Sequence, residues 1–181
     1  MKKFEEKTYH TETIYTGKIV QLDIDSVTLP DGNTSKRELI KHPGAVAVIA
    51  LTDEGKLVLV EQYRKPMEKS MVEIPAGKLE PNESPESCAL RELEEETGYT
   101  SDHLEKVTSF YTSPGFADEI VHLYFTDQLK KLEEGPAGDE DEFVELLELT
   151  LEEAEQMEKD ERIHDAKTAY ALLYWKLRGA K

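Results

Sequence analysis

Hydrophobic and polar residues alternate with different periods along the chain, and these periods predict its elements. Residues 45–51 form a continuous apolar run, which is typical of a strand buried on both faces. The turn signal at residues 53–56 separates this run from a second apolar segment, residues 57–63, which we also expect to be a strand. The first clear helix is predicted at residues 85–97, with Ser84 as its N-cap and a glycine directly after its last residue.

Weaker patterns on both sides of this segment predict the remaining elements. Strands are expected within 9–29 and at 35–41, 107–111, 120–125 and 143–149, and closing helices at 151–159 and 164–177. Because strands and helices do not alternate regularly, we predict an α+β fold with a mixed β-sheet sandwiched between α-helices. We expect two domains, a small N-terminal antiparallel β-rich unit over residues 1–42 and a larger domain over 43–181.

Charge and composition narrow the function classes. The chain of 181 residues has 39 Asp and Glu against 22 Lys and Arg, so its formal net charge is −17. Such a charge repels nucleic acid and anionic membranes, and no apolar run reaches membrane-spanning length. The single cysteine, Cys88, excludes an intrachain disulfide. These features favour a cytoplasmic enzyme, and a phosphate-bearing substrate would need a local cation.

The predicted helix carries an unusual concentration of acid, with four glutamates within residues 92–96. Glu92 and Glu96 lie four residues apart, and like charges at that spacing destabilise a helix by a few tenths of a kcal/mol per pair. A solvated acidic face is the ordinary explanation, but Leu90 and Leu93 anchor another face of the helix in a core. A divalent cation would turn the repulsion into binding, because Mg²⁺ takes hard oxygen ligands and bridges phosphates.

The surrounding residues match a known pattern. Gly77 and Glu83 are separated by five residues, and seven more lead to the run Arg-Glu-Leu-Glu-Glu-Glu-Thr-Gly-Tyr at residues 91–99. This arrangement resembles the box of the Nudix hydrolase family, and every fixed position of that box is met over residues 77–99. The resemblance implies hydrolysis of the pyrophosphate of a nucleoside diphosphate derivative.

The resemblance also implies a metal site. Glu92 and Glu96 correspond to the two box glutamates that hold the metal ions, with Glu95 as an auxiliary ligand. Ala76 precedes the box glycine and would offer its backbone carbonyl oxygen. Arg91 corresponds to the box arginine, which would orient and partly neutralise the carboxylates. The implied cofactor is Mg²⁺ or Mn²⁺, with two or three ions per site.

Features outside the box resemble the ADP-ribose pyrophosphatase subfamily. Pro114 lies fifteen residues after the box, where that subfamily carries a proline, so Pro114, Gly115 and Glu119 become candidate substrate-binding residues. Arg64 resembles the subfamily's arginine that meets the substrate phosphates, a task suited to a guanidinium because its fork binds two oxygens. The alternatives are an ordinary turn at 113–115 and a surface ion pair for Arg64.

Two further expectations concern the N-terminal unit and an acidic loop of the larger domain. The N-terminal unit of this subfamily commonly exchanges across a homodimer and helps to hold adenine, so Arg37 and Tyr15 are candidate substrate contacts; a hairpin folded back on its own domain is the alternative. An acidic loop precedes the strand predicted at 143–149, and it resembles a loop that carries a catalytic glutamate. Both Glu140 and Glu142 fit, and Glu142 is favoured because it lies next to the strand.

The resemblance therefore implies Mg²⁺-dependent hydrolysis of ADP-ribose to AMP and ribose 5-phosphate. One alternative is a Nudix pyrophosphatase for another nucleotide sugar or a dinucleotide, because the box binds a metal and a pyrophosphate that all these substrates share. An alternative from another class is a non-catalytic Nudix-fold sensor that binds a nucleotide and regulates a partner.

Overall fold

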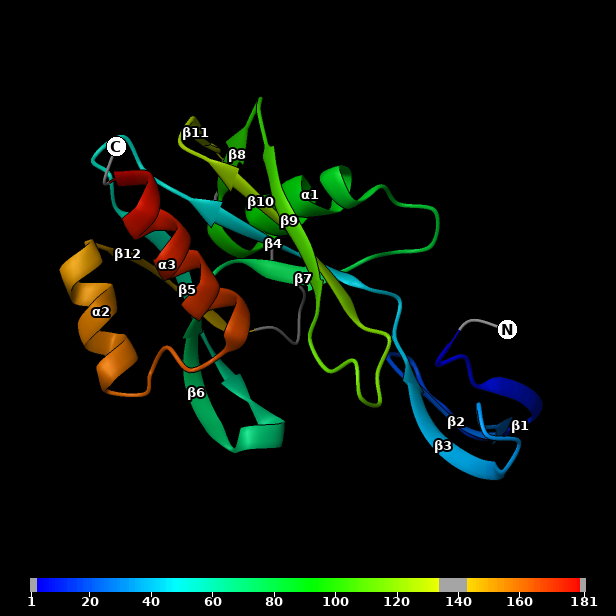
Figure 1. The fold of residues 1–181 in the computed structure, drawn as a ribbon. Helices are drawn as coiled ribbons and strands as arrows, with labels where there is room; N and C mark the ends of the chain where they lie inside the picture. The colour runs from blue at the N-terminus through cyan, green and yellow to red at the C-terminus, as the bar shows by residue number, and fades with distance from the viewer. Residues whose placement is uncertain (1–2, 134–142, 180–181) are drawn as a thin grey trace. The chain divides into compact units, whose positions relative to one another are not determined.

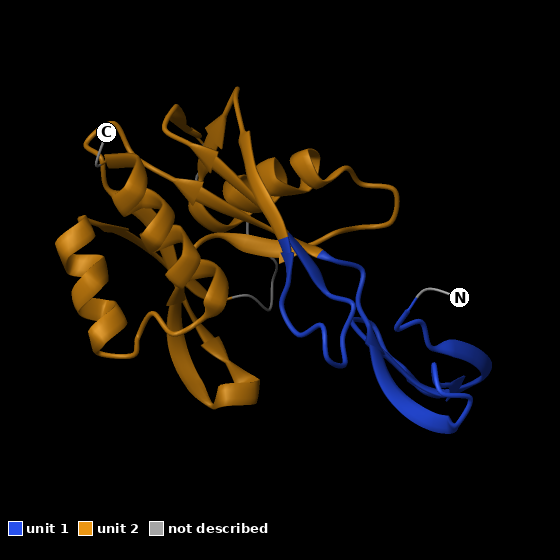
Figure 2. Cartoon of the chain, viewed as in Figure 1, with its two compact units in different colours: residues 1–44, 110–121 blue, residues 45–109, 122–181 orange. Residues whose placement is uncertain are grey.

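The structure is a computed structural model, and it describes residues 3–133 and 143–179. The chain divides into two compact units (Figure 2). Unit 1 comprises residues 1–44 and 110–121, and unit 2 comprises residues 45–109 and 122–181. No helix within the described part of the chain is long and apolar enough to cross a bilayer.

Unit 1 is built on a three-stranded antiparallel sheet in the order β1-β2-β3. Its strands are β1 (Lys7–Thr16), β2 (Gln21–Thr28) and β3 (Thr34–Lys41). The turn between β2 and β3 is set by Asp31, whose Oδ1 accepts a hydrogen bond of 3.0 Å from the Asn33 amide, and by Gly32 at a φ of 88°. This sheet confirms the antiparallel β unit predicted at the N-terminus.

The segment from 110 to 121 joins unit 1 through its contacts with the end of β3. The amide of Ile40 donates to the carbonyl of Phe116 at 2.8 Å, and the amide of Asp118 donates to the carbonyl of Ile40 at 3.1 Å. The Asp118 carboxylate accepts from the His42 amide at 2.8 Å and pairs with Lys41 at 3.1 Å. These contacts connect a loop to residues more than seventy positions earlier in the sequence.

Unit 2 combines three sheets with three α-helices (Figure 1). Its strands are β4 (Ala45–Ala50), β5 (Leu57–Arg64), β6 (Lys69–Glu73), β7 (Ala76–Lys78), β8 (Tyr99–Ser101), β9 (Glu105–Tyr111), β10 (Ile120–Thr126), β11 (Leu129–Lys131) and β12 (Val144–Leu149), although residues 110–111 of β9 and 120–121 of β10 are counted with unit 1. Its helices are η1 (Lys65–Met67), α1 (Pro85–Thr97), α2 (Leu151–Lys159) and α3 (Ala166–Gly179). The sheets have the orders β7-β4-β10-β9, β12-β5-β6 and β11-β8.

The helices of unit 2 form two groups, α1 by itself and α2 together with α3. α1 packs against β4, β5, β7, β8 and β12, and α2 packs against β12 and α3. Figure 1 shows α2 and α3 side by side and apart from α1. The sheets and helices together confirm the predicted α+β class.

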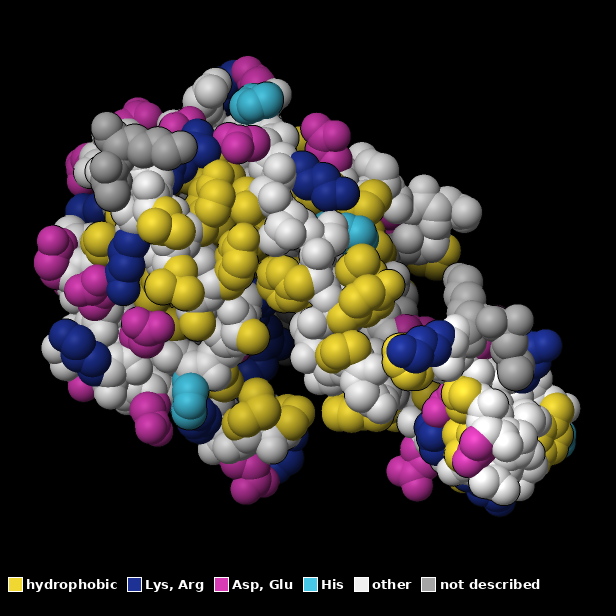
Figure 3. All heavy atoms as spheres, in the orientation of Figure 1, with side chains coloured by type: hydrophobic (Ala, Val, Ile, Leu, Met, Phe, Trp, Pro, Cys, Tyr) yellow, Lys and Arg dark blue, Asp and Glu magenta, His cyan; other side chains and the backbone are white. Residues whose placement is uncertain are grey.

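The core of unit 2 lies between β4, β5 and α1. Residues 46–50 and 57–60 are fully buried, as the two apolar runs predicted. Cys88, Ala89 and Leu93 on one face of α1 pack into the same cluster. Figure 3 shows that other apolar side chains lie on the surface among acidic and basic ones, so only part of the apolar residues forms the core.

Four strands have no counterpart in the sequence prediction: β6, β7, β8 and β11. Three of them are only three residues long. A segment of three residues is too short to show an alternating pattern, and it becomes a strand because a neighbouring strand completes its hydrogen bonds. The last helix also differs from the prediction, because α3 begins at Ala166 rather than at residue 164 and ends at Gly179.

Candidate active site

The ends of α1 determine where its glutamates lie. Ser84 caps the helix by accepting a hydrogen bond of 3.2 Å from the Ser87 amide, and Pro85 occupies the first turn. Gly98 ends it in the left-handed conformation at a φ of 69°, with its amide bonded to the Glu94 carbonyl. These bounds are the predicted ones, and they place the acidic residues in the last turns of a helix anchored on β4 and β5.

Arg91 is the centre of the acidic cluster. Its Nε and Nη2 donate to the two carboxylate oxygens of Glu83 at 2.9 and 3.0 Å. Its Nη1 donates to Glu92 and to Glu95, each at 2.8 Å. The hydrogen bonds from Arg91 lower the pKa of Glu83 from 4.5 to about 2, and the same bonds raise the pKa of Arg91. One guanidinium therefore partly neutralises three carboxylates, one of which, Glu92, belongs to the pair for which the sequence predicts repulsion.

Glu92 lies directly against the backbone of the box glycine. A Cβ atom built on Gly77 would stand 1.8 Å from Cδ of Glu92 and 2.0 to 2.2 Å from its carboxylate oxygens. Only a residue without a side chain leaves this volume to the carboxylate. Glycine at this position therefore serves the placement of Glu92.

Glu96 is held against the residue before that glycine. Its side chain is buried, with 4% of the residue exposed, and Oε2 accepts a hydrogen bond of 3.0 Å from the Ala76 amide. Ala76 lies in β7, which pairs with β4. The short strand thus brings the backbone of residues 76–77 to the carboxylates of Glu92 and Glu96.

The oxygen atoms of these residues are suitable ligands for a divalent cation. Carboxylates and a backbone carbonyl are the hard oxygen ligands that Mg²⁺ takes, and the space kept by Gly77 holds one carboxylate in place. Within residues 3–133 and 143–179, no group of three His, Cys, Asp or Glu side chains forms a ready-made cation cage. Mg²⁺ sites commonly use one or two protein carboxylates and complete their shell with waters and phosphates, so such a cage is not required.

Arg64 lies at the end of β5 and is bound by a buried acid. Its Nε and Nη2 donate to the two oxygens of Glu73 at 2.8 and 2.9 Å. This bond raises the pKa of Arg64, and the charge of Glu96 adds to the effect. Arg64 thus belongs to the same electrostatic environment as the box carboxylates.

The predicted substrate residues of the loop lie in unit 1. Pro114 and Gly115 line a pocket of about 190 Å³, together with Leu39, Ile40 and Lys41 of β3 and residues 116–118. Glu119 accepts a hydrogen bond from the hydroxyl of Thr112, and its Oε1 lies 3.7 Å from Nδ1 of His42.

Arg37 and Tyr15 do not meet within one chain. Arg37 pairs with Glu6 at 2.6 Å and stands opposite Asp25 in the sheet, whereas Tyr15 stands opposite Leu22. Tyr15 is 59% exposed. The two catalytic candidates of the acidic loop, Glu140 and Glu142, fall outside the described residues.

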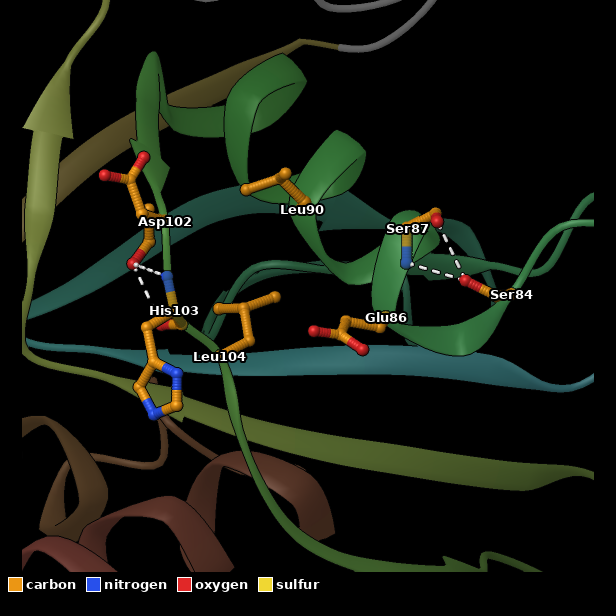
Figure 4. Close-up of a pocket in the computed structure, with 8 residues that line it drawn as sticks. Ser84, Glu86, Ser87, Leu90, Asp102, His103 and Leu104 are labelled. Atoms are coloured by element: carbon orange, nitrogen blue, oxygen red, sulfur yellow. Dashed lines mark hydrogen bonds between the residues drawn. The ribbon is translucent and has the colours of Figure 1, made fainter.

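A separate pocket beside α1 involves none of the predicted site residues (Figure 4). It has a volume of about 240 Å³ and is formed by the first turns of α1 and the segment after β8. Its lining residues are Ser84, Glu86, Ser87, Leu90, Ser101, Asp102, His103 and Leu104. Ser84 and Ser87 bond each other in Figure 4, and Ser101 bonds the backbone of His103, so several of its polar groups are engaged in local structure.

The sequence prediction missed Glu73 and Lys167. Glu73 is 2% exposed and accepts hydrogen bonds from Arg64 and from Lys167 of α3. An acid that directly follows two apolar residues, Met71 and Val72, is only a weak signal that a cation lies nearby. Lys167 has no signal in the sequence, because its partner lies 94 positions away.

Comparison with known proteins places this geometry in a family. The NUDIX domain model matches residues 41–172. A Bacillus subtilis (strain 168) protein called ADP-ribose pyrophosphatase is 58% identical over 180 residues, covering 99% of this chain and 97% of its own. A Bacillus methanolicus protein called methanol dehydrogenase activator is 61% identical over 179 residues, with the same coverage of both chains.

A solved structure supports the fold. The crystal structure of an ADP compounds hydrolase superposes with a TM-score of 0.82 over 97% of this chain and 96% of its own, at 20% identity. At that identity the likeness concerns the fold alone. The complete box, the family model and the relatives lead to the same conclusion, that the chain belongs to the NUDIX domain family.

Proposed function

We propose that this enzyme hydrolyses the pyrophosphate bond of ADP-ribose, giving AMP and ribose 5-phosphate, and that it uses Mg²⁺. The observation that carries the substrate is the 58% identity to an ADP-ribose pyrophosphatase over nearly the whole chain. The structure also supports metal-dependent hydrolysis as the type of reaction. The Glu92 carboxylate lies against Gly77, and the Glu96 carboxylate accepts a hydrogen bond from the Ala76 amide, so two possible metal ligands are held at the same backbone segment. Nudix hydrolases generally use a divalent metal; Mg²⁺, and two or three ions per site, are our specific expectation.

The residues of the box would hold the metal. Glu92, Glu95 and Glu96 would supply carboxylate oxygens and Ala76 its carbonyl. A bound divalent cation supplies Lewis acidity, which activates water and stabilises the charge that develops on the leaving phosphate. Arg91 orients Glu92 and Glu95 by the two hydrogen bonds of its Nη1.

Other residues would act on the substrate. Arg64 would bind the phosphates, and Pro114, Gly115 and Glu119 would contact the rest of the molecule. A glutamate of the acidic loop, Glu142 or the alternative Glu140, would take the proton of the attacking water or orient that water.

A panel of pyrophosphates tests this function. ADP-ribose, GDP-mannose, NAD and a diadenosine polyphosphate are assayed at equal concentration with Mg²⁺, with Mn²⁺ and with EDTA. We expect ADP-ribose to have the highest kcat/KM and EDTA to abolish turnover. A higher kcat/KM for another member would reassign the substrate, and turnover in EDTA would refute the metal dependence.

A second candidate function is suggested by one relative. The 61% identity to a protein called methanol dehydrogenase activator favours a role in which the chain raises the activity of a dehydrogenase. Wild type and Glu96→Gln are each added to a purified methanol dehydrogenase. Activation by wild type but not by Glu96→Gln would show that the effect requires hydrolysis. Activation by both proteins would show that binding is sufficient, and no activation by either protein would reject this candidate.

We also propose that the chain forms a homodimer through its N-terminal sheet. β1 pairs with β2 on one side, and all ten of its residues are exposed. Its exposed apolar residues include Tyr9, Ile14 and Tyr15, and a long edge strand of this kind gains stability when it is covered. Tyr15 and Arg37 would then contribute to an adenine site shared between subunits.

Sedimentation at micromolar concentration tests the dimer, and a monomer would reject the shared site. Deletion of residues 1–42 is expected to yield a monomer with greatly weakened ADP-ribose binding. A truncated form that binds ADP-ribose normally would separate association from recognition. The cytoplasmic location expected from the sequence stays a prediction.

A further inference from the structure

Glu73 is a buried carboxylate that belongs to neither the box nor the predicted substrate loop. It ends β6, and each of its oxygens accepts a hydrogen bond from Arg64, at 2.8 and 2.9 Å. The ammonium group of Lys167 donates to Oε2 as well. Burial by itself would raise the pKa of Glu73, but the hydrogen bonds from the two cations outweigh it and lower that pKa. Glu73 therefore stays ionised between Arg64 and Lys167.

Lys167 comes from the first turn of α3, and neighbouring residues fix it there. Its ammonium group also donates to Oδ1 of Asp165 at 2.9 Å. The same Oδ1 accepts the amides of Lys167 and Thr168 at 3.1 and 3.2 Å, so Asp165 caps the start of the helix. Thr168, which is fully buried, accepts a hydrogen bond of 3.1 Å from the Ile74 amide. The beginning of α3 thus binds two successive residues, Glu73 at the end of β6 and Ile74 directly after it.

The segment that begins at Glu73 is connected to two parts of the candidate site, Arg64 and the Glu96 carboxylate. On one side Glu73 binds the Nε and Nη2 edge of Arg64, so the third nitrogen, Nη1, takes no part in this pair. On the other side residues 74–76 lead directly to the amide that binds Glu96. Because a bidentate pair fixes the plane of a guanidinium, the orientation of Glu73 determines where Arg64 directs its remaining donors.

We propose that Lys167 and Glu73 are positioning residues for the reaction, with Lys167 orienting the Glu73 carboxylate and Glu73 in turn orienting Arg64 toward the substrate phosphates. This inference rests on the proposed function, because it takes Arg64 as the phosphate-binding arginine. It assigns a role in the reaction to α3, a helix that contributes no residue to the box. Without Lys167, the Glu73 carboxylate loses one of its two cations and can rotate with Arg64.

The test compares Lys167→Met with a lysine on the same helix. Lys176 pairs with Glu155 at 2.9 Å, so Lys176→Met is a matched control that removes an ion pair from α3 without touching Glu73. For Lys167→Met we expect kcat/KM for ADP-ribose to fall on the order of 10-fold, mainly through KM. We expect Lys176→Met to stay within about twofold of wild type. Glu73→Gln, which keeps an acceptor oxygen, should resemble Lys167→Met.

A double-mutant cycle separates positioning from general stability. Arg64→Lys keeps the charge and loses the fork, so adding Lys167→Met to it should cause little further loss of kcat/KM. A structural defect would instead lower activity equally in both backgrounds, and additive losses would overturn the proposal. Lys167→Arg should recover part of the activity, since it restores a cation beside Glu73.

A measurement that does not depend on activity tests the positioning role of Lys167 separately from the proposed hydrolysis of ADP-ribose. The NMR signal of the Arg64 Nε–H, assigned by its loss in Arg64→Lys, should exchange with water faster in Lys167→Met than in wild type. An unchanged exchange rate would overturn the positioning role even if activity fell. Wild type that leaves ADP-ribose intact would refute the proposed function, whereas the exchange rate would still decide whether Lys167 holds Arg64.

Discussion

Replacing Gly77 with alanine should separate activity from stability. The added Cβ would lie 1.8 Å from Cδ of Glu92, where ordinary van der Waals contact begins at 3.4 Å. The carboxylate must therefore move by 3.4 − 1.8 = 1.6 Å or more, or the backbone must shift. The carboxylate is the far end of a flexible side chain, so it is the part that yields.

The expected magnitudes follow from this displacement. A misplacement of about 1 Å in a catalytic group can cost on the order of 100-fold in rate, equivalent to roughly 2.7 kcal/mol of activation free energy. We therefore expect kcat/KM of Gly77→Ala to fall by about 100-fold or more. The φ of Gly77 is not in the left-handed region, and an alanine in a permitted conformation changes the free energy of unfolding by less than about 1 kcal/mol.

The assay pairs steady-state hydrolysis of ADP-ribose with urea unfolding. Gly179→Ala is the control, because a Cβ at Gly179, the last residue of α3, meets no atom within 4 Å. Gly77→Ala with wild-type kcat/KM would refute the need for Glu92 at its present position. A loss of several kcal/mol in unfolding free energy would instead show that the backbone, and not the carboxylate, absorbs the clash.

Three further predictions concern the same acidic cluster. Glu96→Gln should keep the fold, because the amide oxygen can still accept from Ala76, but it should lower kcat by about 10³-fold; near wild-type turnover would remove Glu96 from the metal site. Millimolar Mg²⁺ should raise the melting temperature by roughly 2–4 °C relative to EDTA-treated protein, since it binds only the folded chain, and an unchanged melting temperature would contradict a metal site built from the box glutamates. Glu83→Gln should destabilise the protein at pH 7 and less so as the pH falls below 4.5: the folded-state pKa of Glu83 is lowered to about 2, so its contribution is present above 4.5 and is lost as the pH falls toward 2. Urea unfolding of both proteins at pH 7 and pH 3.5 measures this, and a constant difference between the two pH values would contradict the role given to its charge pair with Arg91.

Local signals explain why one part of the site was predictable. The helix at Pro85–Thr97 has the predicted bounds, because Ser84, Pro85 and Gly98 act on the backbone within a few residues of themselves. The box residues are likewise close in sequence, so their resemblance to the Nudix family could be recognised from the sequence alone. The match to the NUDIX domain model confirms the family. The α+β class followed from the two apolar runs and the irregular order of strands and helices.

Tertiary structure decided what lies around that helix. β7 exists because β4 offers it hydrogen bonds, and this pairing brings Ala76 to Glu96, twenty positions later. Glu73, Arg64 and Lys167 come from two strands and a helix, and no pattern in the sequence marks a pair 94 positions apart. The sequence determined the chemistry that α1 carries and the family to which it belongs, because those signals depend on neighbours along the chain. Only the folded chain decided that the Ala76 amide binds Glu96 and that Arg64 and Lys167 both bind Glu73, because such contacts depend on packing between distant segments.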